Sequence, residues 1–269
     1  MKGIVQGMLD SIYGSDVING LVDSLRFDVI GGLQGNLNGI YTNVFLPVAM
    51  YIMVIYFLVN LIDRSIMFEH MDTSQIVKQL FTLGGCYMLL LHGFEILGWL
   101  LTAGGAILDT VSGLYGVSGS SVTAMTASEF MDSVGISPGF LDLGYLGGMV
   151  FLFIPWLFSL FVPIVFKFVC YSRLIEIGVR MAMMPVSLID FFNNGVNGSG
   201  WRNLKAFLAI AMQTVTLFIV VLVFSFIMDG VLGSGLGGFD ILMAMVAVEL
   251  SCMGLAIKSQ GLTKELLGA

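Results

Sequence analysis

Charged side chains are scarce in this 269-residue chain, where they make up 11% of the composition, whereas 57% of the residues are apolar. An ordinary soluble domain is about a quarter charged and about half apolar. The mean hydropathy of the chain is +0.97. The deficit of charge therefore excludes an ordinary soluble domain and indicates a protein that spans a membrane.

Cysteine is also rare, and the three cysteines Cys86, Cys170 and Cys252 show no pairwise motif spacing. The pattern implies neither a disulfide nor a metal site, and favours buried free thiols that behave as small hydrophobic side chains. The sequence also lacks a nucleotide-binding glycine loop, an HExxH motif, a CxxC motif and a nucleophile elbow. We therefore expect no enzyme activity, no cofactor and no metal.

Five apolar segments are each long enough to cross a bilayer as a helix, which takes about 20 residues. Pro155 and Pro163 lie inside the third segment and predict kinks there. The expected fold is an all-α polytopic membrane protein. The segments cover about 41–62, 75–101, 147–171, 206–228 and 239–257.

Lysine and arginine are distributed unevenly between the connections of these spans. Nine of the eleven lie between spans one and two, between spans three and four, at the facing ends of these spans, or in the tail, and the two intervening connections hold none. Because basic residues favour the cytoplasmic side, this pattern predicts an external N-terminus and a cytoplasmic C-terminus. The expected parts are an external N-terminal segment at 1–40, a five-span domain at 41–258 with an external loop at 102–146 and a cytoplasmic helix–loop at 172–205, and a cytoplasmic tail at 259–269.

Two short helices are expected outside the spans. Thr126 and Glu129 form a capping-box pattern, which predicts a helix in the external loop. Near the N-terminus, apolar residues at helical spacing predict an amphipathic helix, which lies either on the outer membrane face or against the bundle as ordinary core. These residues are Ile18, Leu21, Val22 and Leu25.

Three ionisable residues lie at membrane depth. His92 and Glu95 are three residues apart on one face of the second span. They are candidates for metal ligands, for a proton relay, or for a hydrogen-bonded pair that faces a neighbouring helix, although two ligands do not make a metal site. Glu249 lies near the middle of the fifth span, where it either has a function or is a protonated carboxyl that bonds a neighbouring helix.

A mainly polar stripe follows the third span at spacings of three or four residues. It predicts that the span continues as a helix to about Asp190, with Pro185 as a point of bending. Glu176 and Arg180 have the order of an i,i+4 ion pair. The stripe faces either the cytosol, or a pore or partner subunit. Its members are Lys167, Cys170, Arg173, Glu176, Arg180, Met183, Ser187 and Asp190. Beyond it, Trp201, Arg202 and Lys205 are expected to anchor the start of span four at the membrane interface.

The run from Ser172 to Gln213 contains an A-x-x-P motif at Ala182, a G-x-x-x-S-G motif at Gly195 and an LK-x-F-L-A motif at Leu204. Together with the helix that carries Glu176 and Arg180, these motifs resemble the TrbL/VirB-type polytopic membrane subunit of type IV secretion and conjugation machines, in the form found in Gram-positive mobile elements. The stretch from Pro47 to Ser65 resembles the first hairpin of that family.

The resemblance implies a non-enzymatic channel or scaffold subunit in a bacterial cytoplasmic membrane, which works with other secretion subunits and ATPases in the transfer of DNA or protein. It implies roles in assembly or in the channel for Lys167, Arg173, Glu176, Arg180, Pro185, Arg202 and Lys205. Because five spans can hardly enclose a pore for a macromolecule, we expect a homo-oligomeric ring packed through small residues. Two alternatives remain: a secondary transporter or ion channel that uses His92, Glu95 and Glu249, and a permease subunit coupled to a separate ATPase.

Overall fold

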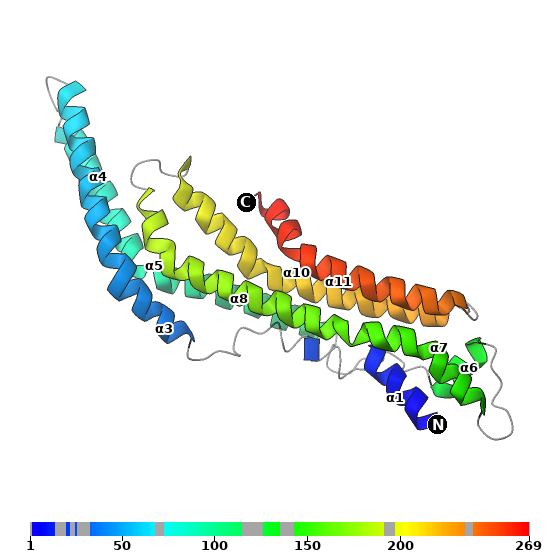
Figure 1. Ribbon diagram of the computed structural model, residues 1–269. Helices are drawn as coiled ribbons and strands as arrows, with labels where there is room; N and C mark the ends of the chain where they lie inside the picture. The colour runs from blue at the N-terminus through cyan, green and yellow to red at the C-terminus, as the bar shows by residue number, and fades with distance from the viewer. Residues whose placement is uncertain are drawn as a thin grey trace. The chain divides into compact units, whose positions relative to one another are not determined.

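The structure is a computed structural model, and its described residues are 2–13, 20–21, 25, 33–67, 73–114, 126–134, 143–190, 197–234 and 239–268. Within these ranges every regular element is a helix (Figure 1). The elements are α1 (Lys2–Tyr13), α3 (Leu33–Ile40), the π-helix η2 (Tyr41–Phe45), α4 (Leu46–Met67), α5 (Thr73–Leu114), α6 (Ala127–Val134), α7 (Leu143–Ser159), α8 (Phe161–Leu188), α10 (Ser199–Gly233) and α11 (Phe239–Leu267).

Five helical segments are long and apolar enough to cross a membrane, which confirms the predicted all-α polytopic fold. Most of them extend beyond the apolar runs that predicted them, because polar residues continue the helices at their ends. Asp72 and Gln75 have the spacing of a capping box at the start of span two, but Asp72 lies outside the described residues. The segments are Gln34–Asp63, Ile76–Gly113, Leu146–Leu188, Ser199–Gly233 and Phe239–Leu267.

The third span is interrupted once, at Leu160, between α7 and α8. Pro163 explains the position of this break, because its ring would clash with the carbonyl four residues earlier, at Ser159. Pro155, by contrast, is accommodated inside α7. After the break, α8 continues through Tyr171 to Leu188, as the stripe predicted.

The chain divides into two compact units, of which the first comprises Met1–Phe27, Gly105–Ser172 and Gln213–Leu262. Its core is apolar and draws buried side chains from every helix of the unit. The largest of these are fully buried aromatic rings: Phe130 of α6, Phe166 of α8 and Phe218 of α10.

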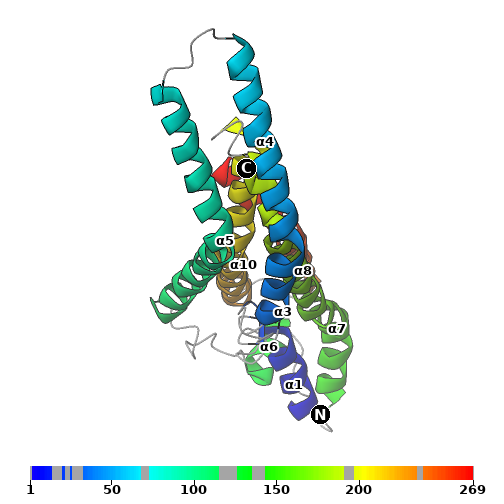
Figure 2. The ribbon, with the colours of Figure 1, turned by 90° about the vertical axis from the view of Figure 1, so that its left-hand side faces the viewer.

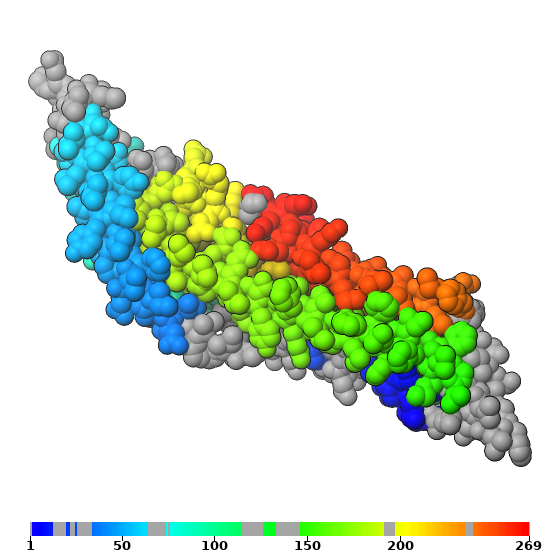
Figure 3. Space-filling model, in the orientation of Figure 1, coloured from blue at the N-terminus to red at the C-terminus, as the bar shows by residue number. Residues whose placement is uncertain are grey.

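Within the first unit, α1 packs against α7 and α6, as the neighbouring blue and green atoms of Figure 3 show. The N-terminal segment therefore contains a helix, α1, that lies before the residues at which the apolar pattern predicted one. Leu21 and Leu25 are buried in the same core, in agreement with the alternative in which this segment packs on the bundle. Ile18 and Val22 lie outside the described residues.

The capping box before α6 is confirmed. The carboxylate of Glu129 accepts a hydrogen bond from the backbone N–H of Thr126 at 2.8 Å, and the Thr126 hydroxyl accepts one from the Glu129 N–H at 3.3 Å. These hydrogen bonds hold the pKa of the Glu129 carboxyl below its usual value. Gln6 of α1 accepts a further hydrogen bond from the Ala127 N–H at 2.8 Å, which joins α1 to the start of α6.

The second unit comprises Asp28–Gly104, Arg173–Met212 and Thr263–Ala269. Within it, α4 and the first part of α5 are neighbouring helices (Figure 2). The Tyr41 hydroxyl donates a hydrogen bond of 2.6 Å to the Leu90 carbonyl, and its ring meets Phe94 edge-on at 5.5 Å. Gly93 permits this approach, because a Cβ there would lie 2.5 Å from the Tyr41 hydroxyl.

Two features of this unit differ from the expectations. The first span was expected from Tyr41, but it begins at Gln34, and the π-helix η2 occupies Tyr41–Phe45, where the Leu46 N–H donates to the Tyr41 carbonyl. The external loop was expected from residue 102, but α5 continues to Leu114. The glycines there do not end the helix, because Gly104 packs closely on α10, where a Cβ would lie 3.0 Å from the Ala211 carbonyl oxygen.

Candidate functional site

The second unit contains a polar network built on the stripe of α8. One oxygen of Glu176 accepts hydrogen bonds from Arg180 Nε at 3.1 Å and Nη2 at 2.9 Å. The predicted ion pair therefore forms, with both side chains only partly exposed, at 29% and 26%. Lys264, near the end of α11, approaches the same oxygen at 3.9 Å.

The network continues from α8 to α10 through Asn203. Arg180 Nη1 donates to the Asn203 carbonyl oxygen at 2.8 Å, and the Asn203 amide nitrogen donates to the Ser187 hydroxyl at 2.9 Å. The cluster of Glu176, Arg180, Ser187, Asn203 and Lys264 thus joins side chains from three helices. We call it the α8 cluster.

The two ends of α8 and α10 are linked by a separate contact. The carboxylate of Asp190 accepts a hydrogen bond from the backbone N–H of Ser199, the first residue of α10. A carboxylate at this position satisfies an N–H that has no partner inside the helix and interacts favourably with the positive end of the helix dipole.

The remaining candidates of the stripe and of the start of span four lie at other positions on α8 and α10. Arg173 is buried, and Pro185 is buried one turn before the end of α8. Lys167 belongs to the first unit, where its side chain is exposed, and Arg202 is exposed on α10. The ammonium group of Lys205 lies 5.9 Å from the centre of the Trp201 ring, in a cation–π geometry.

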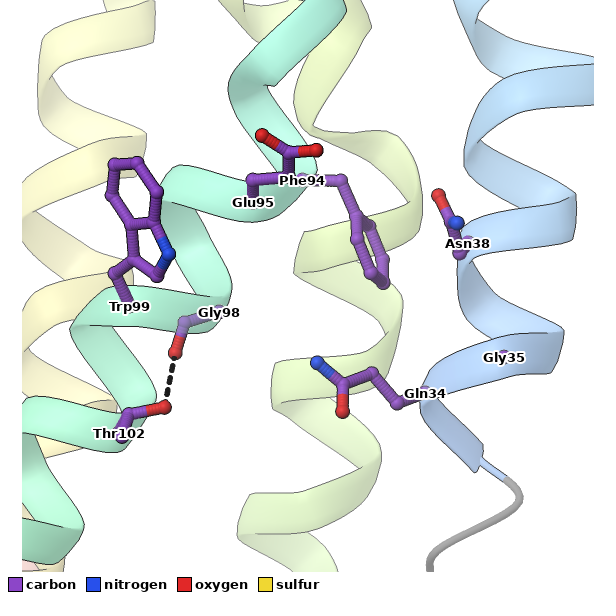
Figure 4. Close-up of a pocket in the computed structure, with 8 residues that line it drawn as sticks. All are labelled: Gln34, Gly35, Asn38, Phe94, Glu95, Gly98, Trp99 and Thr102. Atoms are coloured by element: carbon purple, nitrogen blue, oxygen red, sulfur yellow. Dashed lines mark hydrogen bonds between the residues drawn. The ribbon is translucent and has the colours of Figure 1, made fainter.

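A second polar site, here called the α3–α5 groove, is a pocket of about 480 Å³ in the second unit (Figure 4). Gln34 and Asn38 project from α3 toward α5, and Phe94 projects from α5 toward α3. Glu95 is the one charged side chain in the lining, so the groove offers carboxylate, amide and hydroxyl oxygens and no basic group. The lining residues are Gln34, Gly35, Asn38, Phe94, Glu95, Gly98, Trp99 and Thr102.

His92 and Glu95 form the predicted pair at the edge of this groove, with 3.1 Å between Nδ1 and Oε2. Their side chains are 58% and 62% exposed, so the described helices of the unit leave most of the pair uncovered. Both residues lie inside the helical segment Ile76–Gly113, which is apolar enough to span a membrane. The groove therefore places ionisable groups on an uncovered surface of a membrane span.

Glu249 belongs to the first unit and differs from the other candidates in being completely buried. Neither of its carboxylate oxygens has a hydrogen-bond partner among the described residues. The alternative in which the Glu249 carboxyl forms a hydrogen bond to a neighbouring helix is therefore wrong for the residues that the structure describes. Between α10 and α11, the Gln213 amide donates a hydrogen bond to the Ser259 hydroxyl at 2.8 Å.

The three cysteines are buried and form no disulfide among the described residues, as expected of thiols in an apolar core. Among the residues that the structure describes, no group of three or more histidine, cysteine, aspartate or glutamate side chains is arranged to hold a metal ion.

The contributions of Asn203 and Lys264 to the α8 cluster and those of Gln34 and Asn38 to the groove were not expected. No local pattern marks these residues, because each acts through a helix that is distant in sequence. Comparison of the chain with known proteins adds no family to this description: no protein-family model, curated protein or solved structure matches it.

Proposed function

We propose that this chain is a channel or scaffold subunit of a conjugative type IV secretion machine in a bacterial cytoplasmic membrane. The proposal combines the resemblance of the segment from Ser172 to Gln213 with the five apolar helical segments. In this role the protein catalyses no reaction. It forms part of the membrane path for DNA or protein, together with copies of itself, other secretion subunits and their ATPases.

The observation that carries the proposal is the exposed His92–Glu95 pair beside the α3–α5 groove. Ionisable side chains in membrane spans face a bundle interior or a water-filled cavity, because contact with hydrocarbon is unfavourable. A single copy leaves this pair uncovered. The surface therefore requires a neighbouring subunit or an aqueous path, and both are available in a homo-oligomeric ring.

The α8 cluster supports the scaffold part of the proposal. It ties α8, α10 and α11 together at one place through an ion pair and hydrogen bonds. Such a junction would keep the helix ends in a fixed arrangement while partner subunits bind. Arg202, Lys205 and Lys167 lie outside the cluster and are the basic candidates for contact with partners or with transferred nucleic acid.

The test is a transfer assay in cells whose copy of the protein has been deleted and replaced by variants. Removing the chain should abolish transfer, and the purified complex should contain a conjugation ATPase or coupling protein. The double variant His92→Leu, Glu95→Leu should reduce transfer at a normal membrane level, because it replaces the polar surface by an apolar one. Met88→Leu is the matched control, since Met88 is 60% exposed on the same helix. Normal transfer without the chain would contradict the proposal.

A secondary transporter or ion channel is the second candidate function. The His92–Glu95 pair and the unpartnered Glu249 favour it, because such groups bind and release protons or cations inside membranes. Uptake of a small solute or ion by the protein alone in liposomes would support this candidate. Absence of uptake in liposomes, together with co-purification of a transfer ATPase, would support the channel or scaffold role in conjugation.

A further inference from the structure

Glu249 lies at the centre of its membrane span. Helix α11 carries Asp240 in its first turn and Lys258 on its later part, and Glu249 is nine residues from each. At about 1.5 Å of rise per residue, each of these charges is about 13–14 Å away along the axis. The hydrocarbon core of a bilayer is about 30 Å thick. The carboxyl group therefore lies near the bilayer midplane.

No group in its surroundings pairs with the carboxyl. Glu249 is 0% exposed, and both oxygens lack a hydrogen-bond partner in the described part of the chain. The buried core of the first unit contains two other titratable side chains, Cys170 and Cys252, and neither is basic. The facing part of α10, from Gln213 to Met228, has no ionisable residue, and Lys167 of α8 is exposed outside this core.

A structural role as a link between helices does not account for Glu249. The Gln213–Ser259 hydrogen bond already joins α10 to α11 in the same unit. An ionised carboxylate without a partner is strongly unfavourable in an apolar core, so the group holds a proton. Its depth in the span is typical of functional carboxyls in membrane proteins.

A cavity of about 220 Å³ lies between α10 and α11 in the same unit. Its lining on α11 includes Val248, Ser251 and Cys252, which are close to Glu249 along the chain, and does not include Glu249 itself. Val223 of α10 and Leu255 of α11 also line it, and both side chains are 43% exposed. The cavity is therefore mostly apolar and has an exposed rim, which gives a lipophilic molecule a way in from the bilayer.

We propose that Glu249 is an intramembrane proton-binding site, detectable with a lipophilic carbodiimide that enters from the bilayer. The reagent reports the protonated form of the group. The carboxylic acid O–H adds across one C=N bond, the proton passes to nitrogen, and acyl migration from oxygen to nitrogen leaves a stable N-acylurea. The step has no leaving group and needs no oxidant or reductant. The proposal depends on the membrane fold and not on the conjugative role.

The first experiment treats membranes that contain the full chain with dicyclohexylcarbodiimide and maps the adducts by peptide mass spectrometry. An adduct is expected on Glu249, with its yield falling as the pH is raised, and is expected to be lost in Glu249→Gln. Glu176, which is paired with Arg180, is the internal control and should remain unmodified. A water-soluble, charged carbodiimide should leave Glu249 unmodified and label exposed carboxyls such as Glu265. Absence of the lipophilic adduct, or equal labelling of Glu249 by both reagents, would overturn the proposal.

The second experiment separates an exchanging proton from a permanently trapped one. Infrared difference spectra of the reconstituted protein should contain a carboxylic acid C=O band that shifts on transfer to D₂O and is missing in Glu249→Gln. The glutamine variant keeps the size of the side chain without the acidic proton, and Cys252→Ser controls for a change at the cavity wall. A band that does not shift on prolonged exchange in D₂O would refute proton exchange. Labelling and infrared spectra are independent of any transfer assay, so failure here is distinguishable from failure of the conjugative role.

Discussion

Replacing Arg180 by alanine removes the centre of the α8 cluster. The variant loses two hydrogen bonds to Glu176 and one to Asn203, and it leaves Lys264 at 3.9 Å as the remaining ion-pair partner of Glu176 in the cluster. Hydrogen bonds to charged groups contribute about 1.5–3 kcal/mol, and solvent screening reduces this for partly exposed side chains. We expect the free energy of unfolding to fall by about 1–2 kcal/mol.

The assay is thermal unfolding of the purified protein in detergent or nanodiscs. Since about 1 kcal/mol shifts the melting temperature of a protein of this size by about 2–4 °C, the expected decrease is about 2–8 °C. Arg202→Ala is the matched control, because Arg202 is exposed on α10 and belongs to no contact of the cluster. A decrease no larger than that of the control would refute the energetic role assigned to the cluster.

A double-mutant cycle with Glu176→Gln tests whether the pair itself carries the effect. If Arg180 acts mainly through Glu176, the two changes should be coupled by about 0.5–3 kcal/mol. Additive effects would instead assign the loss to the Asn203 contact. In the transfer assay, Arg180→Ala should reduce transfer when membrane levels are equal, because the helix ends that it joins are then no longer held together.

Three further outcomes are expected. Cysteines introduced at Ser128 and Ser199, both exposed, should react with an impermeant thiol reagent from opposite sides of intact cells, and labelling from one side would contradict the predicted topology. Glu129→Gln should speed hydrogen exchange in α6. The pKa of the Glu129 carboxyl is lowered in the folded state, so the carboxylate stabilises the fold at pH values above its unfolded pKa. This stabilisation is lost as the pH falls through the folded pKa. In acid, hydrogen exchange in α6 of the unmodified protein should therefore approach that of Glu129→Gln. Gly93→Ala should lower the melting temperature, since its Cβ would meet the Tyr41 hydroxyl at 2.5 Å, whereas Gly113→Ala, which has nothing within 4 Å, should not.

The sequence predicted those features that depend on neighbouring residues along the chain. The five spans follow from long apolar runs, and the capping box of Thr126 and Glu129 follows from local hydrogen bonding. The continuation of α8 past Tyr171 follows from a stripe with helical spacing. These predictions are reliable because the responsible interactions are formed within a few turns of one helix.

Features that depend on packing between distant segments were not predictable in this way. Gly104 and Gly105 are typical of a helix end, but contact with α10 keeps α5 helical through them. Ser187 was assigned to a stripe, while its partner Asn203 lies 16 residues away on another helix. Glu249 was correctly recognised as unusual, but its lack of a partner becomes visible only when the residues around it are known.

The π-helix at Tyr41–Phe45 has a consequence for changes in chain length. A π-turn closes its hydrogen bond over five residues instead of four, so it accommodates one residue more than an α-turn. Deleting one residue in this segment would allow a continuous α-helix from α3 into α4. Because the π-turn uses one residue more for about the same rotation, the deletion would leave α4 close to its present rotation about its axis relative to α3. The buried side of the first span, marked by Met53, would therefore stay buried, whereas the same deletion inside α4 would turn the following residues by about 100°.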